Sequence, residues 1–315
     1  MWRYVLRRVI ILIPTALVVT LGIFVLMRTA VGGDPTLYLM GHEATLQQAA
    51  QARARLGLDR PIIVQYLDWL RRLGSLDLGR SFEYPMDVRS ALAGRLPATL
   101  ELTLLATLLA LLTAIPAGVF TAVAGSSPLG RVATAATMAG ICVPNFWLGM
   151  LLIYLFGVEL GWLANSAYVP FTENWRQNIA SMLLPAVSLA AYYSASWTRY
   201  LSSALLDVLH SDYIRVARAK GLMDRTILYK HALRNAIIPL VTVVGQSVPY
   251  MLAGAVIVEV VFSLPGIGRL FSDGIQSRDY PVVQGTVLLV TIAVVLSSLV
   301  VDLAYGVLDP RIKYD

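Results

Sequence analysis

The chain has 315 residues, of which 57% are hydrophobic and only 14% are charged, and its formal net charge is +6. Soluble domains carry about 25% charged residues, so this composition is typical of a membrane protein and excludes a disordered, fibrous or disulfide-stapled chain. The one cysteine cannot form an internal disulfide, and the three histidines lie far from it and from one another in the sequence. We therefore expect no metal site.

Long stretches without charged residues predict the membrane spans. A helix needs about 20 apolar residues to cross roughly 30 Å of hydrocarbon. Six stretches are long enough: residues 9–27, 102–131 (apolar as far as 124), 132–158, 178–198, 235–258 and 280–301. Backbone groups in lipid must bond within their own segment, so the sequence predicts an all-α fold with six transmembrane helices.

Positive charges near the spans predict the orientation. The first eight residues carry three arginines and the loop at 207–234 carries six Lys and Arg, whereas the short loops on the other side carry three in total. The positive-inside rule therefore places both termini in the cytoplasm, and the basic net charge reflects topology rather than a nucleic-acid partner. The predicted parts are an inner stub with the first span (1–28), an extracytoplasmic segment (29–97), a five-helix core (98–305) and an inner tail (306–315).

The extracytoplasmic segment predicts two further helices. Residues 44–56 have the composition of a polar helix, and residues 61–73 are amphipathic, with Ile63, Tyr66, Leu67 and Leu70 on one side. A loop is expected at 74–81.

The long cytoplasmic loop predicts two short helices at the membrane surface. Asp212 is a suitable N-cap, Gly221 is a natural left-handed helix stop, and Asp224 can cap a second helix that ends at about Leu233. Two interpretations remain open from the residues alone. Either the helices lie at the membrane interface and their basic residues only reflect the positive-inside rule, or the helices form a docking surface for a cytoplasmic partner.

The chain is not expected to hydrolyse ATP itself. It has three lysines, and none of them follows a glycine, so the phosphate-binding pattern G-x-x-x-x-G-K-[ST] is absent. We expect no catalytic residue and no directly bound cofactor.

The loop resembles the coupling loop of permeases from ATP-binding-cassette (ABC) importers of the dipeptide, oligopeptide and nickel family. Residues 212–221 read D-Y-I-R-V-A-R-A-K-G, and H-A-L-R-N begins at His231. In the general permease pattern E-A-A-x3-G-x9-I-x-L-P, Ala217 matches the second alanine, Gly221 the glycine and Leu233 the leucine. Arg215 replaces the glutamate and His231 the isoleucine, and these departures are similar to the peptide and nickel branch.

Six further strings in chain order resemble the same branch. They are G-D-P at 33–35, L-P-A-T-L-E-L at 96–102, V-P-N-F-W-L-G at 143–149, G-A-V-I-V-E at 254–259, F-S-L-P-G-I-G at 262–268 and L-D-P-R at 308–311. The resemblance implies the fold of a type I importer permease in the bacterial inner membrane. It also implies four kinds of partner: a second homologous permease, two ATP-binding subunits that hold ATP and Mg, an extracytoplasmic solute-binding protein, and membrane lipid.

The resemblance also implies which residues contact the ATP-binding subunits. They are Tyr213, Arg215, Ala217, Arg218, Gly221, His231 and Leu233. A short helix parallel to the membrane can transmit the movement of ATPase domains to the spans.

Three residues are candidates for the translocation path or its gate. Glu259 is an ionisable group in the fifth span, Pro144 can make a hinge in the third, and Tyr193 in the fourth could line a path for peptides. Each has a structural alternative: a hydrogen bond or interfacial solvation for Glu259, a packing kink for Pro144 and a membrane anchor for Tyr193.

The expected function is translocation of dipeptides or oligopeptides by alternating access. A secondary transporter would predict ion-coupling acids or broken helices near mid-membrane in two related halves, and the sequence shows neither. A structural subunit of a membrane assembly would explain the spans and the loop equally well on physical grounds. Nickel-chelate and glutathione importers of the same branch look alike here, so the substrate stays open.

Overall fold

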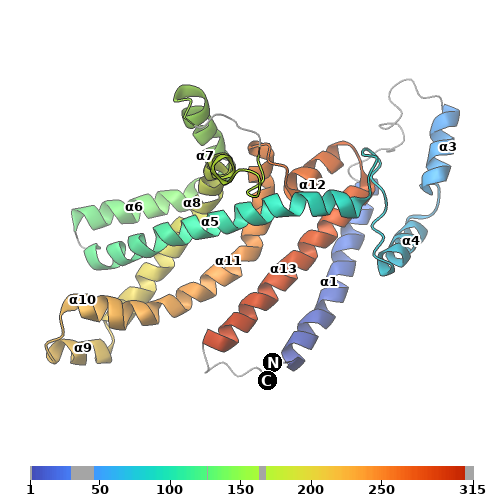
Figure 1. Ribbon diagram of the computed structural model, residues 1–315. Coiled ribbons are helices and arrows are strands. Elements are labelled where there is room, and N and C mark those ends of the chain that lie inside the picture. Colours follow the sequence, from blue (N-terminus) through green and yellow to red (C-terminus); the bar gives the residue numbers. More distant parts are fainter. Residues whose placement is uncertain (1, 30–45, 126, 163–167, 309–315) are drawn as a thin grey trace. The chain divides into compact units, whose positions relative to one another are not determined.

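The computed structural model describes residues 2–29, 46–125, 127–162 and 168–308 (Figure 1). Within these ranges every regular element is a helix, apart from an isolated bridge between Arg80 and Asp87. The predicted all-α fold is therefore confirmed. Three predicted features lie outside the described residues: the string at 33–35, the start of the outer helix at 44, and the tail string from residue 309.

Five helices in the described ranges are long and apolar enough to cross a membrane. They are residues 10–29 of α1 (Trp2–Thr29), α5 (Val88–Ala124), α8 (Trp175–Leu209), the helix Asp224–Val261, and residues 280–301 of α13 (Tyr280–Leu308). A bent pair of helices supplies a sixth span if the pair is counted as one.

The third predicted span is not a single helix, so the prediction of one helix over 132–158 is wrong. Its first half is α6 (Pro128–Cys142). Its second half is α7 (Asn145–Leu152), which continues as a π-helical turn, η1 (Ile153–Glu159). The angle between the two halves is 102°. Val143 and Pro144 are both extended, with ψ of 121° and 135°. Proline lacks an N–H and disfavours the helical conformation of the residue before it, so α6 ends where this pair begins.

The chain divides into two compact units, and the division passes through α5 and α13. The first unit comprises Met1–Thr99 and Ser263–Leu296, and the second comprises Leu100–Phe262 and Ser297–Asp315. The predicted domain limits at 28, 97 and 305 stay predictions.

In the first unit, two helices follow α1 in sequence: α3 (Leu46–Leu56) and α4 (Ile62–Gly74). Helix α4 packs against α1, and the Tyr66 hydroxyl donates to the Leu17 carbonyl oxygen at 3.0 Å. The buried or half-buried hydrophobic residues of α4 are Tyr66, Trp69, Leu70 and Leu73. This spacing of i, i+3, i+4 and i+7 is one helix face.

The buried face of α4 therefore overlaps only in part with the predicted apolar side. Ile63 and Leu67 are 68% and 51% exposed. In a membrane protein an apolar side chain faces lipid or a partner as readily as the core, so apolarity alone did not identify the buried face.

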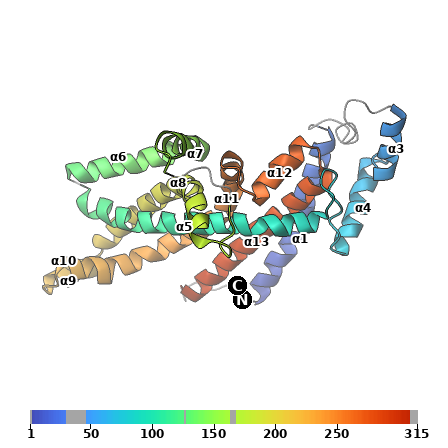
Figure 2. The same cartoon turned by 45° about the horizontal axis from the view of Figure 1, so that its top comes forward.

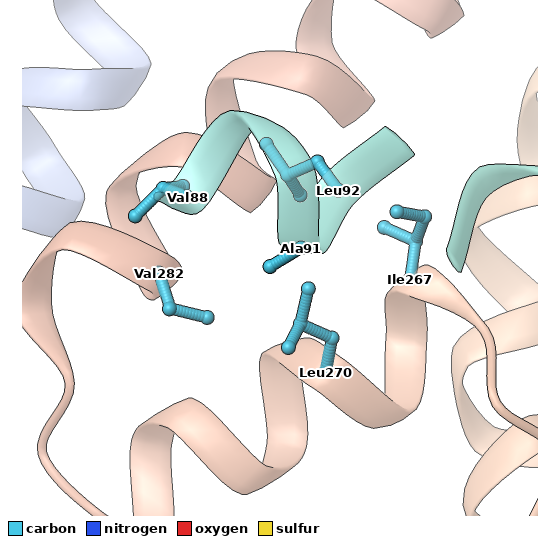
Figure 3. Close-up of a cluster of buried hydrophobic side chains, with 6 residues drawn as sticks. All are labelled: Val88, Ala91, Leu92, Ile267, Leu270 and Val282. Carbon is cyan, nitrogen blue, oxygen red and sulfur yellow. The ribbon is translucent and has the colours of Figure 1, made fainter. Parts of the chain in front are cut away.

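A second cluster in this unit joins three helices (Figure 3). Val88, Ala91 and Leu92 at the start of α5 point towards Ile267 and Leu270 of α12 (Ile267–Gln276) and towards the start of α13. Asp279 is 1% exposed and caps α13, since its carboxylate accepts from the backbone N–H of Val282 at 3.3 Å. The same carboxylate accepts from the N–H of Phe82 at 3.0 Å, so it also holds the loop before α5.

In the second unit, α8 packs against α6, α7 and α11 (Leu233–Val261). The Trp197 indole of α8 donates to Ser247 Oγ of α11 at 3.2 Å. Gly149 of α7 permits a close approach, because a Cβ there would lie 3.0 Å from the Phe262 ring and 3.1 Å from Ser188 Oγ. Small residues at such contacts are typical of helix packing in membranes.

Candidate functional site

The predicted coupling loop forms a short helix followed directly by the fifth span. Helix α8 ends at Leu209, Ser211 is extended, and α9 runs over Asp212–Ala219. The N-cap position is held by Ser211, so the prediction that Asp212 caps the helix is wrong by one position. Asp212 is the first helical residue instead, where a negative charge still interacts favourably with the helix dipole.

The glycine at the end of α9 stops the helix as predicted. Gly221 has φ of +78°, its N–H donates to the Arg218 carbonyl at 2.9 Å, and the Leu222 N–H donates to the Ala217 carbonyl at 3.3 Å. This pair of bonds is the Schellman arrangement. A Cβ at Gly221 would have no described neighbour within 4 Å, so the left-handed backbone, and not lack of space, requires glycine here.

The second predicted loop helix is not a separate element, and its predicted end at about Leu233 is wrong. Helix α10 (Asp224–Thr226) passes into a π-helical turn, η2 (Ile227–Ala232), which continues as α11. The N-cap position belongs to Met223, one residue before the predicted Asp224. The loop therefore ends inside the helix Asp224–Val261, which is a candidate membrane span. Isolated π-helical turns within helices are common at functional sites.

Helix α9 is anchored to the base of α11. Ile214 is fully buried, as is Ala232, and Ile227 is 1% exposed, so the contact of α9 with η2 is apolar. Full burial of one isoleucine side chain contributes about 1.5–3 kcal/mol. In addition, Asn235 Nδ2 donates to the Tyr213 hydroxyl at 3.0 Å and to the His231 carbonyl oxygen at 2.8 Å.

The outer face of this segment is apolar and basic. Large apolar side chains are exposed on it, namely those of Tyr213, Val216, Leu222, Met223 and Tyr229. Exposed basic residues lie between them, namely Arg215, Arg218, Lys220, Arg225 and Lys230. Exposed apolar clusters with a polar rim are typical of protein contact sites. In both views α9 and α10 lie together at the end of α8 and at the start of α11 (Figures 1 and 2).

A cavity of about 600 Å³ lies beside this face. Its lining comes from the end of α5, the end of α8 and the stretch from α9 to η2 (212–232), which we call the coupling segment after its predicted role: Val123, Leu209, Arg218, Asp224, Arg225, Ile227, Leu228 and Tyr229. Arg218 Nε lies 3.7 Å from Asp224 Oδ1, and Arg215 pairs with Asp212. Both pairs are exposed, and such pairs contribute about 0–1 kcal/mol, so they add little to the stability of this segment.

The structure brings together most of the residues predicted to contact a partner. Tyr213, Arg215, Ala217, Arg218 and Gly221 lie on α9 and its cap, His231 lies on η2, and Leu233 is the first residue of α11. Ala217, His231 and Leu233 are half-buried and the other four are exposed.

Sequence reasoning missed four residues of this region: Ile214, Leu222, Met223 and Tyr229. The signal for Ile214 was a single isoleucine inside a polar helix. The apolar pair Leu222–Met223 after the stop glycine was the signal for the exposed patch.

The three candidate path residues lie on different elements. Pro144 is exposed at the break between α6 and α7, Tyr193 of α8 is buried against Tyr192 and Trp197, and Glu259 near the end of α11 is 1% exposed. None of the three lines the cavity beside the coupling segment.

Two family comparisons cover nearly the whole chain. Residues 114–314 match the family described as "Binding-protein-dependent transport system inner membrane component", and residues 1–103 match its N-terminal membrane component. The chain is also similar to a solved structure described as an amino acid ABC transporter with histidines, with 17% identity and a TM-score of 0.52. That similarity covers 71% of this chain and 95% of the other, and it concerns the fold alone.

Curated relatives match over their full length. The oligopeptide transport system permease protein of Bacillus subtilis (strain 168) is 38% identical over 317 residues, covering 100% of both chains. The di/tripeptide transport system permease protein of Pseudomonas aeruginosa (strain UCBPP-PA14) is 40% identical, covering 100% of this chain and 99% of the relative.

A third relative has a different named substrate. The glutathione transport system permease protein of Salmonella choleraesuis (strain SC-B67) is 38% identical and is covered completely, as is this chain. With its helical spans and the matches at both ends, the chain belongs to the binding-protein-dependent transport system inner membrane components, the non-catalytic permeases of ABC importers.

Proposed function

We propose that this chain forms the translocation path for short peptides in its importer. The support is the set of relatives: oligopeptide and di/tripeptide permeases match over the full length at 38% and 40% identity. Glutathione is a second candidate substrate, because a glutathione permease is 38% identical and glutathione is itself a tripeptide. Direct uptake decides between them: a peptide importer takes up labelled trialanine, whereas a glutathione importer takes up labelled glutathione and no trialanine.

We further propose that α9 and the following turn dock on an ATP-binding subunit. The observation that carries this is the exposed apolar and basic face, which is held through buried Ile214 to the helix that becomes the fifth span. ATP and Mg bind to the partner subunits. This chain supplies a rigid lever, and movement of the docked ATPase tilts α11 and so changes the side from which the path is open.

The proposed orientation follows from the same docking. The coupling segment and both termini face the cytoplasm, as the positive-inside rule predicts. The path and its gate include Tyr193, Glu259 and the break at Pro144. A break at a valine–proline pair is a natural hinge, because proline has no N–H to donate to a helical hydrogen bond across the break.

The proposed partners are a second homologous permease, two ATP-binding subunits and an extracytoplasmic solute-binding protein. Purification of a tagged copy from its native membrane in mild detergent, followed by mass spectrometry, tests this set. The proposal predicts recovery of another multi-span permease with one or two ATPases. Recovery of the folded chain alone, still active in ion-driven uptake, contradicts it and favours a secondary transporter.

A further inference from the structure

The first unit contains a second cavity, far in sequence from the coupling segment. Its volume is about 860 Å³, and it is lined by the end of α1, residues 54–60, α4, the loop at 77–82 and the start of α13. Small-molecule sites usually have volumes of about 300–1,000 Å³. The cavity is therefore large enough for a short peptide.

Positive charge dominates its lining. Five arginines line it, namely Arg28, Arg60, Arg71, Arg72 and Arg80, against two aspartates, Asp68 and Asp77. Part of this charge is neutralised, since Arg60 lies 3.1 Å from Asp68 and Arg80 lies 3.4 Å from Asp87. The excess of guanidinium groups favours an anion, because guanidinium matches the geometry of carboxylate and phosphate oxygens.

Two buried hydrogen-bond donors in the same lining lack acceptors. Trp69 Nε1 and Gln284 Nε2 have no hydrogen-bond partner among the described residues, although the two side chains are only 4% and 3% exposed. A buried polar group without a partner costs about 1–3 kcal/mol, and such groups are rare in native proteins. Both atoms are donors, so the group that would satisfy them is an acceptor.

Aromatic surface completes the lining. Phe24, Phe82 and Tyr280 line the cavity, and the Arg28 guanidinium lies over the Phe24 ring at 3.6 Å and over the Tyr280 ring at 4.8 Å. A site with donors and cations beside aromatic rings suits a ligand that has a carboxylate and an apolar body. A short peptide has both.

We propose that this cavity binds the carboxylate end of a short peptide, with Trp69 and Gln284 as donors to its oxygens. This inference rests on the proposed peptide function. In the proposed orientation the end of α1 and the start of α13 face away from the cytoplasm, so the cavity lies on the side where a binding protein delivers its cargo. The site would hold the peptide before it enters the path.

Binding of trialanine to the full-length chain in phosphatidylcholine nanodiscs tests the proposal by calorimetry. We expect trialanine to bind and trialanine amide, which lacks the carboxylate, to bind at least tenfold more weakly. Trp69→Phe and Gln284→Met each remove one donor and are expected to weaken binding of trialanine about tenfold. Gln284→Glu keeps the shape but adds a negative charge, and we expect it to abolish binding.

Matched controls lie outside the cavity. Trp175→Phe and Gln246→Met change exposed residues elsewhere and are expected to leave binding unchanged, and the melting temperature of every variant is measured in parallel. Equal binding of acid and amide, or folded Trp69 and Gln284 variants that bind like the wild type, overturns the proposal. Loss of peptide binding when phosphatidylglycerol is added to the nanodisc also overturns it, because an anionic lipid headgroup is then the preferred occupant.

Uptake by the complete transporter separates this inference from the proposed function. If the assembled importer takes up trialanine while the isolated permease does not bind it, the cavity proposal is wrong and the peptide function stands. If the importer takes up no peptide at all, the proposed function is wrong.

Discussion

Asn235, in the first turn of α11, donates a hydrogen bond to the hydroxyl of Tyr213, in the first turn of α9, at 3.0 Å. This bond links the proposed docking helix to the span it would move. Both residues are exposed, so the bond contributes at the lower end of the usual range of about 0.5–1.5 kcal/mol. Its role is to fix an angle more than to stabilise the fold.

A double-mutant cycle tests this link. Tyr213→Phe removes only the hydroxyl, and Asn235→Leu removes its donor. We expect each change to lower the number of peptides taken up per ATP hydrolysed by about twofold, with no further loss when the two are combined. Additive losses in the reconstituted transporter would show that the two residues act separately.

Burial of Ile214 is expected to hold α9 in place. Ile214→Ala should cost about 2–5 kcal/mol of local stability, because it leaves a cavity against η2, and amide hydrogen exchange of residues 212–219 should become faster. Val216→Ala is the control, since Val216 is 53% exposed and such substitutions usually change stability by less than about 0.5 kcal/mol. Unchanged exchange in the Ile214 variant would mean that α9 does not depend on this contact.

The left-handed backbone at Gly221 predicts that different substitutions there lower peptide uptake to different degrees. Gly221→Ala and Gly221→Glu force a side chain into a conformation that costs about 1–2 kcal/mol, and we expect ATPase activity to continue while peptide uptake falls. Gly221→Asn should retain most of the uptake, because asparagine tolerates this conformation. Normal uptake in the glutamate variant would contradict the account of the turn.

The break at Pro144 is expected to depend on the proline. In Pro144→Ala the residue regains an N–H, and the conformation of Val143 is no longer restricted. Spin labels at Ala135 and Leu151, both exposed and on opposite sides of the break, should then report longer distances as the two helices straighten. An unchanged distance distribution would mean that contacts of α7 with α8 and α11 set the angle.

The sequence identified the helical spans and the short helix at 212–219 because both depend on local signals. Long charge-free stretches, the stop at Gly221 and the family strings are all read directly from the chain. It was harder to predict that the second loop helix continues into the fifth span. The helix through Thr226 and Ile227 contains a π-helical turn, and no hydrophobic period predicts one. Pro144 was correctly identified as an interruption, but its effect of 102° depends on the preceding valine and on the packing of α7.

The outer cavity could not be predicted. Trp69 and Gln284 are 215 positions apart in the numbering of the chain, and each alone reads as an ordinary helix residue. They line one cavity only because α4 and the start of α13 belong to the same unit. A missing hydrogen bond is visible only once the surroundings of both donors are known.

The most direct test of the central claim is ATP-dependent uptake of labelled trialanine into proteoliposomes. The vesicles contain this chain with its co-purified permease and ATPases, and the binding protein is added at the extracytoplasmic side. We predict uptake that requires both ATP and the binding protein and that fails when the permease carries Gly221→Glu. Uptake by this chain alone, driven by an ion gradient and indifferent to ATP, would contradict the account.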